Sequence, residues 1–142
     1  MNIYIQKYDS LDLRIKFSCE IKILIPKINV YLKVKNHDAL ITNQYNEKAI
    51  KIPIAHGEGR FFADKKTLNE LEKNNQIIFQ YCDKNGIVDD DSNPNGSLLN
   101  IAGICNKNRN VFGMMPHPER AADPLLNNIA VSYTHLTLPT NR

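Results

Sequence analysis

Cysteine is scarce in this sequence. The 142 residues include three cysteines, Cys19, Cys82 and Cys105, which are widely spaced and form no Cys-x-x-Cys pair. An odd count at such spacing excludes a disulfide framework or a zinc knuckle as the basis of the fold. The pattern is typical of a protein in a reducing compartment, and we expect a cytoplasmic location.

The sequence also lacks long apolar runs and blocks of like charge. No stretch approaches the roughly 18 apolar residues that a membrane helix requires, and the start, MNIYIQKYDS, lacks the pattern of a signal peptide. The net charge is only +3, and the lysines and arginines form no continuous run interleaved with aromatic residues. We therefore expect neither a membrane nor a nucleic acid as a partner.

What the sequence does contain is a series of short apolar segments between polar turns, at a length that suits one domain. A helix is predicted from Asp64 to Asn75, with Asp64 as its N-cap and with Leu68 and Leu71 on one face. A helix among strands indicates an α/β or α+β fold. Strands are predicted at Ile21–Ile25, Val30–Val34, Ala49–Ala55 and Gln76–Cys82, with a hairpin formed by Ile101–Cys105 and Val111–Met115.

The strongest candidate for catalysis is the segment MMPHPER, which follows the last predicted strand. Pro116 and Pro118 flank His117 and hold it on a stiff, extended stretch of chain. Glu119 is near enough to accept a hydrogen bond from one imidazole nitrogen, which leaves the other nitrogen free to act as a general base. A His-Pro-Glu in a loop is more often only a turn, and a metal site is disfavoured because no further ligand cluster accompanies it.

Three strings resemble a known family: GMMPHPERA at 113–121, IPIAHGEG at 52–59, and the loop NPNGS at 93–97 followed by IAGI. His-Pro-Glu is shared by class I glutamine amidotransferases. Its combination with HGEG and NPNGS resembles the glutaminase subunits of phosphoribosylformylglycinamidine synthase. The resemblance is strong over residues 49–126, and it implies an α/β fold that is the C-terminal part of a flavodoxin-like amidotransferase domain, with an incomplete central sheet.

The resemblance implies roles for individual residues. His117 matches the catalytic base of the family, and Glu119 matches the carboxylate that orients it. His56 and Glu58 match the HGEG turn, which contributes to the pocket, to a partner interface, or only to the turn itself. Glutamine is the implied substrate, and its ammonia passes to a synthetase subunit that uses ATP and magnesium, in a complex with a small accessory subunit. No cofactor is expected in this chain.

The sequence departs from the family in one respect that affects activity. The nucleophile of the family lies on a Gly-x-Cys-x-Gly elbow, and this sequence has no such motif. Gly103-Ile104-Cys105 copies part of the elbow, but Lys107 replaces the second glycine, so we interpret Cys105 as structural. We expect a truncated amidotransferase that is inactive alone. The alternatives are a non-catalytic module that binds a partner, or the C-terminal end of a fused single-chain synthase.

The expected domain boundaries follow from where the resemblance begins and ends. Residues 13–128 are assigned to the amidotransferase domain, and residues 1–12 stay unassigned. Residues 129–142 are interpreted as an unrelated tail, because VSYTHLTLPT lacks the Ile, Asn and Lys that dominate the rest and resembles the translation of a sequencing adapter. His135 in this tail carries no functional weight.

Overall fold

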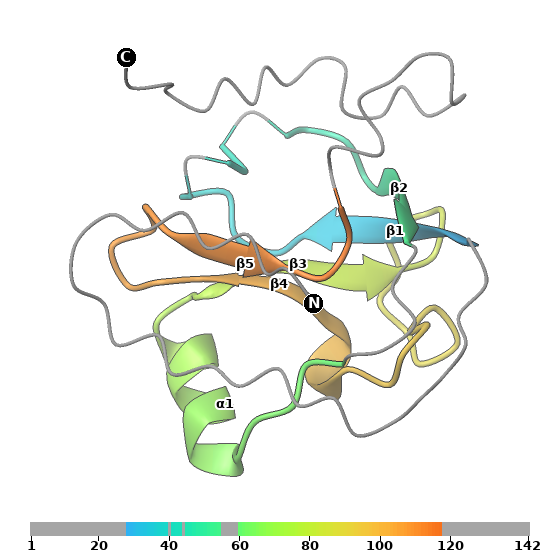
Figure 1. The fold of residues 1–142 in the computed structure, drawn as a ribbon. Helices are drawn as coiled ribbons and strands as arrows, with labels where there is room; N and C mark the ends of the chain where they lie inside the picture. Colours follow the sequence, from blue (N-terminus) through green and yellow to red (C-terminus); the bar gives the residue numbers. More distant parts are fainter. Residues whose placement is uncertain (1–27, 40, 44, 55–59, 118–142) are drawn as a thin grey trace.

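A curled sheet with one α-helix against it forms the described part of the chain (Figure 1). The computed structural model describes residues 28–39, 41–43, 45–54 and 60–117. The strands are β1 (Ile28–Val34), β2 (Ile50–Ile54), β3 (Ile77–Cys82), β4 (Ile101–Cys105) and β5 (Phe112–Met114), and the helices are α1 (Lys65–Lys73) and the short 3₁₀ helix η1 (Leu98–Asn100).

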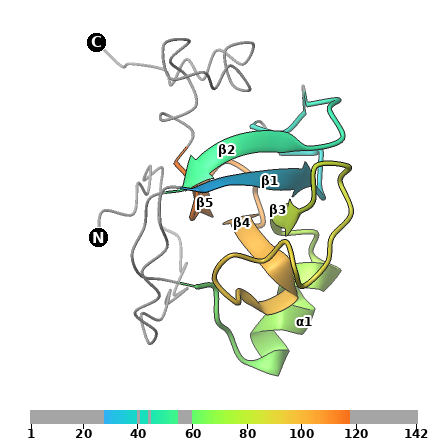
Figure 2. The same cartoon turned by 90° about the vertical axis from the view of Figure 1, so that its right-hand side faces the viewer.

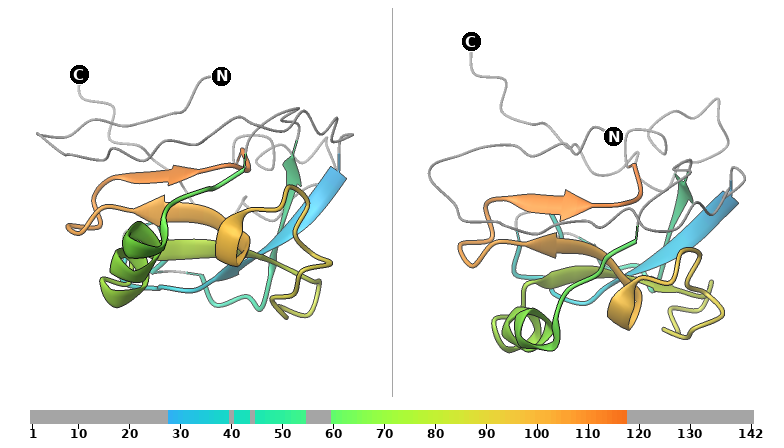
Figure 3. Two further views of the ribbon diagram at one scale, coloured as in Figure 1. Left: turned by 90° about the horizontal axis from the view of Figure 1, so that it is seen from below. Right: turned by 60° about the horizontal axis from the view of Figure 1, so that its bottom comes forward.

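The five strands lie in the order β2-β1-β3-β4-β5, and every neighbouring pair is antiparallel. The sheet curls into a half-barrel, so that β1 and β2 bend over β4 and β5 (Figure 2). Figure 3 shows α1 and η1 on the outer side of this curl. Such curling brings the two edge strands, β2 and β5, closer than a flat sheet would allow.

The strands form where the sequence pattern predicts them. In β2, Ile50, Ile52 and Ile54 are buried, whereas Lys51 between them is exposed, as expected of a strand with one wet face. Strand β3 is buried along both faces because it lies between β1 and β4 in the middle of the sheet. The expectation of a mixed α/β fold is confirmed, and the predicted strand at Ile21–Ile25 lies outside the described residues.

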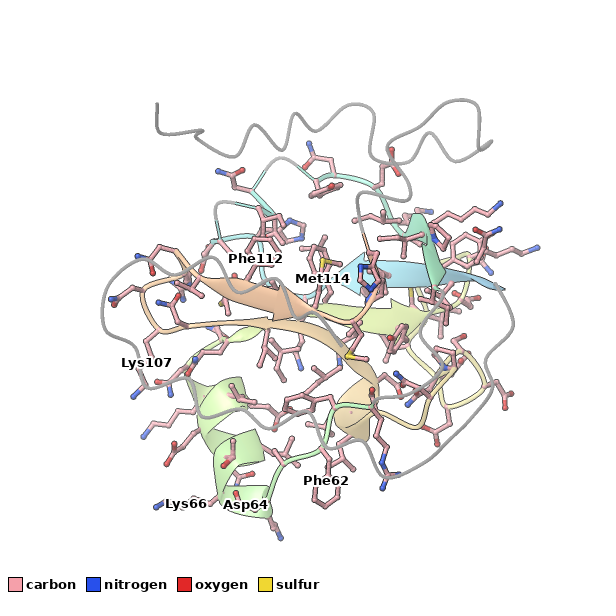
Figure 4. The ribbon with its side chains drawn as sticks, viewed as in Figure 1. Phe62, Asp64, Lys66, Lys107, Phe112 and Met114 are labelled. Atoms are coloured by element: carbon pink, nitrogen blue, oxygen red, sulfur yellow. The ribbon has the colours of Figure 1, made fainter. Side chains whose placement is uncertain are left out.

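Two apolar clusters hold the sheet, one on each side of it. The inner cluster lies within the curl, and Phe112 and Met114 of β5 point toward it (Figure 4). The outer cluster packs Leu71 of α1 against the sheet, and a buried side chain of this size stabilises the fold by about 1.5–3 kcal/mol. The inner cluster is Val30, Leu32, Val34, Ala39, Ile50, Ile52, Ile54, Ile78, Phe79, Tyr81, Ala102 and Cys105, and the outer one is Phe61, Leu71, Ile77, Ile101 and Ile104.

Helix α1 begins and ends with the signals that the sequence predicts. The Asp64 carboxylate accepts a hydrogen bond from the backbone N–H of Thr67 at 2.7 Å, which confirms the predicted N-cap. This bond also lowers the pKa of Asp64 below its ordinary value. The helix stops at Asn74 and Asn75, where Asn75 takes a left-handed conformation (φ 51°) that asparagine tolerates better than most residues.

Candidate functional site

Three strands lead to the sequence motifs at one end of the sheet, the end toward which their C-termini point. Because each strand is antiparallel to its neighbours, β2, β3 and β5 all run in the same direction, and the arrows of β3 and β5 point the same way in Figure 1. Their C-termini therefore all point toward the same end of the sheet. The HGEG turn follows β2, the loop 83–97 with NPNGS follows β3, and His117 follows β5.

His117 stands on a segment that is tied to the sheet. The backbone N–H of Met115 donates a hydrogen bond to the carbonyl oxygen of Ala102 at 2.9 Å, which extends the pairing of β5 with β4. Pro116 is fully buried next to it, and His117 itself is half-buried. The imidazole is thus held at the sheet edge by a stiff and anchored backbone, as a general base requires.

The remaining predicted site residues cannot be compared with this geometry. Glu119, His56 and Glu58 lie outside the described residues. Their proposed roles therefore stay predictions. Strands β2 and β5 run in the same direction, so that Ile54 and His117 both lie toward the same end of the sheet.

The loop after β3 is shaped by carboxylate and amide side chains. The Asp83 carboxylate accepts hydrogen bonds from the backbone N–H groups of Asn85 (2.9 Å) and Ile87 (2.7 Å). The bond from Ile87 is the main reason that the pKa of Asp83 is lowered. Gly86 has a φ of +83°, and a Cβ there would lie 2.6 Å from the carbonyl oxygen of Lys48, so only glycine fits.

The NPNGS motif forms a polar network that the sequence pattern alone does not predict. The side-chain oxygen of Asn93 accepts from the N–H of Ser97 (3.1 Å), while its amide group donates to the Ser97 carbonyl (2.8 Å) and to the side-chain oxygen of Asn100 (2.7 Å). Asn100 in turn donates to the carbonyl of Asp89 (2.8 Å). These bonds fold the loop onto itself beside the end of β3. The motif marks this loop in the sequence, but it does not indicate which side chains form hydrogen bonds with each other.

A buried tyrosine lies under this loop. The amide group of Asn95 donates to the Tyr81 hydroxyl at 3.5 Å, and Tyr81 is fully buried. Burial raises the pKa of the Tyr81 phenol well above its ordinary value of 10.0, so that it stays protonated at neutral pH. Tyr81 is therefore a structural support for the loop and not an acid–base group.

The two described cysteines are buried thiols. Cys105 ends β4. Its backbone N–H donates a hydrogen bond to the Gln76 carbonyl at 2.8 Å, and its carbonyl accepts one from the Gln76 side-chain amide at 2.8 Å. Burial raises the pKa of the Cys105 thiol, and burial raises that of Cys82 to about 11. A tight turn and strand β5 follow Cys105, where the family elbow has a helix. Both features fit the interpretation of Cys105 as structural.

Gly103, which stands where the first glycine of the Gly-x-Cys-x-Gly elbow would be, has a packing role. A Cβ at Gly103 would lie 3.0 Å from the Phe79 ring and 3.1 Å from the Cβ of Met114, its partners in β3 and β5. The glycine thus lets three strands approach closely. Its place is inside a strand of the sheet and not on a strained turn.

Neither a metal cluster nor a membrane helix occurs in the described part of the chain. Within residues 28–39, 41–43, 45–54 and 60–117, no group of three or more His, Cys, Asp or Glu side chains could hold a metal ion. The same residues contain no helix long and apolar enough to cross a membrane.

The chain is similar over most of its length to known proteins of one class. The family model of the CobB/CobQ-like glutamine amidotransferase domain matches residues 27–137, so the chain belongs to this family. Within the family, it is 51% identical over 100 residues to the phosphoribosylformylglycinamidine synthase subunit PurQ of Methanocaldococcus jannaschii, which covers 70% of this chain and 44% of that protein. It is 53% identical over 106 residues to PurQ of Thermosynechococcus vestitus, covering 74% of this chain and 44% of that protein.

A solved structure leads to the same family. The structure of PurLQS from Thermotoga maritima matches with a TM-score of 0.55 and 36% sequence identity, covering 74% of this chain and 42% of that chain. The expected resemblance to a PurQ-like glutamine amidotransferase is confirmed, and the fold is part of an amidotransferase domain. The chain spans less than half the length of these curated relatives.

Proposed function

We propose that this chain carries the catalytic base of the glutaminase subunit of phosphoribosylformylglycinamidine synthase, which hydrolyses glutamine to supply ammonia for purine synthesis. The observation that most supports this proposal is the anchored position of His117, at the end of the sheet toward which β2, β3 and β5 all run. The similarity of more than half of the chain to PurQ subunits supports the choice of reaction.

In this proposal His117 takes the proton of a cysteine thiol, and the thiolate attacks the side-chain amide carbon of glutamine. The imidazolium returns the proton to the leaving nitrogen, so that ammonia departs and a thioester remains. Water then hydrolyses the thioester to glutamate and regenerates the thiol. Glu119 orients the imidazole, and His56 and Glu58 shape the pocket or contact the partner.

The proposed partners follow from the same reaction. Ammonia is consumed by a synthetase subunit that binds ATP and magnesium, in a complex that includes a small accessory subunit. The chain itself needs no cofactor for amide hydrolysis. The similarity to a structure named PurLQS supports the presence of partner subunits.

We assign the nucleophile to a part of the family domain that this sequence does not contain. The sequence has no Gly-x-Cys-x-Gly motif, and Cys82 and Cys105 are buried with raised pKa values. A buried and protonated thiol is a poor nucleophile. We therefore expect the chain to be inactive alone.

A hybrid enzyme tests this proposal. In it, residues 27–128 of this chain follow the N-terminal part of the Methanocaldococcus relative, and glutamate release from glutamine is measured for the hybrid and for the chain alone. We expect activity only from the hybrid. His117→Gln should lower its kcat by about 10²- to 10⁴-fold, the usual contribution of a general base.

His37→Gln is the matched control, because His37 is exposed on the segment after β1 and should leave kcat unchanged. Glutamine hydrolysis by the chain alone, abolished by Cys105→Ser, would contradict the assignment of the nucleophile. A fully active His117→Gln hybrid would contradict the assignment of the base.

A second candidate function is a non-catalytic module that binds a partner, and the burial of both described thiols favours it. The presence of both His117 and Glu119 in the sequence disfavours this candidate, because a module that catalyses no reaction has no need of either residue. The end of a fused single-chain synthase is a third candidate, which the similarity to separate PurQ subunits does not favour.

A further inference from the structure

Two motifs that are far apart in the sequence are joined by hydrogen bonds. The HGEG turn ends at residue 59, and Phe61 follows shortly after it. The backbone N–H of Phe61 donates to the hydroxyl oxygen of Ser97, the last residue of NPNGS, at 2.9 Å. The Phe61 carbonyl accepts from the N–H of Leu98 at 3.1 Å. The loop after β3 thus holds the chain as it leaves the HGEG turn.

The Ser97 hydroxyl is bonded as both donor and acceptor. While it accepts from Phe61, it donates to the side-chain oxygen of Asn95 at 2.8 Å, and that oxygen also accepts from the N–H of Ser97 at 3.1 Å. The three residues are buried, with exposed fractions of 0% for Phe61, 3% for Ser97 and 4% for Asn95. Because water has little access, a lost partner here would leave a buried donor unsatisfied.

The described residues on either side of the HGEG motif are both fixed. Its entrance is Ile54, the last residue of β2, which is buried and pairs with Ile28 of β1. Its exit is Phe61, bonded to Ser97. Six residues, 55–60, connect these two points in the sequence.

We infer that Ser97 is a positioning residue: its hydroxyl fixes Phe61, shortly after the HGEG motif in the sequence, toward the end of the sheet that carries His117. The inference rests on the proposed glutaminase function, in which the turn contributes to the pocket or to the partner interface. Ser97 acts through Phe61 and does not touch the substrate. Threonine at position 97 would keep the hydrogen bond from the Phe61 N–H, whereas alanine would remove the acceptor of that bond.

The first experiment uses the full chain and measures amide hydrogen exchange. Ser97→Ala should speed exchange of the Phe61 amide by about tenfold or more, because its acceptor is lost. Ser97→Thr keeps the oxygen and should restore slow exchange. Thr42→Val is the matched control: Thr42 is buried and its hydroxyl donates to the Ala39 carbonyl at 3.1 Å, at a site remote from NPNGS in the sequence.

The second experiment measures the KM for glutamine in the hybrid enzyme, together with the thermal stability of each variant. Ser97→Ala should raise KM by about tenfold, as expected from the loss of one buried hydrogen bond, and Ser97→Thr should restore it. Thr42→Val should lower the melting temperature without changing KM. An unchanged KM in Ser97→Ala, or an equal rise in Thr42→Val, would overturn the inference.

The two proposals fail in different ways. If the hybrid with Ser97 intact releases no glutamate, the proposed function fails. If that hybrid is active but Phe61 exchange and KM are indifferent to the hydroxyl, only the role of Ser97 is overturned. Restoration by threonine in both measurements supports a positioning role, because general destabilisation by a change at this site would not depend on the hydroxyl.

Discussion

His117 and Cys105 lie close in the sequence, on either side of β5, yet their surroundings differ. His117 is half-buried at the edge of the sheet, whereas Cys105 is fully buried at the end of β4. Burial raises the pKa of the Cys105 thiol, although the positive charge of Arg109 acts in the opposite direction, while partial exposure leaves an imidazole accessible to a substrate. The same short stretch of chain therefore holds one half-buried imidazole and one fully buried thiol.

The buried thiols predict a labelling result. In a Cys19→Ser background, the folded chain should not react with iodoacetamide near neutral pH, whereas the unfolded chain should react at both Cys82 and Cys105. Mass spectrometry counts the modified thiols. Rapid labelling of Cys105 in the folded chain would contradict its interpretation as structural.

The pKa of Cys82 also predicts a pH dependence of stability. Its folded value of about 11 lies above the ordinary value of 9.0, so the unfolded chain loses this proton first as the pH rises. The stabilising contribution is therefore complete below about pH 9 and is lost between about pH 9 and pH 11. Cys82→Ala should lack this part of the fall in the free energy of unfolding, as measured with urea across this range.

At the scale of the elements, the turn between β4 and β5 depends on one asparagine. Asn106 is fully buried, and its side-chain oxygen accepts from the N–H groups of Asn110 and Val111, both at 3.0 Å. Its amide group donates to the side-chain oxygen of Asn110 at 2.7 Å. These bonds close the hairpin that leads to His117.

Asn106→Ala should therefore lower the free energy of unfolding by about 1–3 kcal/mol, because two backbone donors lose their acceptor in a poorly hydrated site. Urea unfolding of the variant gives this value. Asn108→Ala in the same turn is the control, since Asn108 is exposed and should change stability by less than about 0.5 kcal/mol. Equal effects of the two changes would exclude the proposed role of Asn106.

The elements themselves were largely predictable. The strand within Ala49–Ala55 and the N-cap at Asp64 both follow from local rules of strand and helix formation, and both predictions are confirmed. The network of Asn93, Asn95 and Ser97 was not predictable in the same way. Each of these residues favours turns in general, and only the folded loop decides which donor meets which acceptor.

At the scale of the whole molecule, the described residues form a curled sheet that is part of an amidotransferase domain. The matched relatives are more than twice as long as the region they share with this chain. A stable protein–protein interface buries about 1,200–2,000 Å² in total. Such an interface takes about 20–30 residues from each partner, and we expect this chain, which matches 44% of each relative, to supply only part of them.

We therefore expect the hybrid enzyme to bind the purified synthetase subunit, and the chain alone not to bind it. Size-exclusion chromatography of the mixed proteins, or calorimetric titration, would measure this. A hybrid that carries His37→Gln should bind as the parent hybrid does. If the chain alone bound as tightly as the hybrid, the non-catalytic binding module would become the better interpretation.

The sequence by itself determined the local features: the described strands, the capped helix, and the motifs that indicate the family. These depend on residues within a few positions of each other, and local periodicity and motif spacing encode them directly. The tertiary structure alone decided that β2, β3 and β5 run toward the same end of the sheet, that Cys105 is buried, and that Ser97 holds Phe61. Each of these depends on how segments that are distant in the sequence pair and curl, which no local pattern specifies.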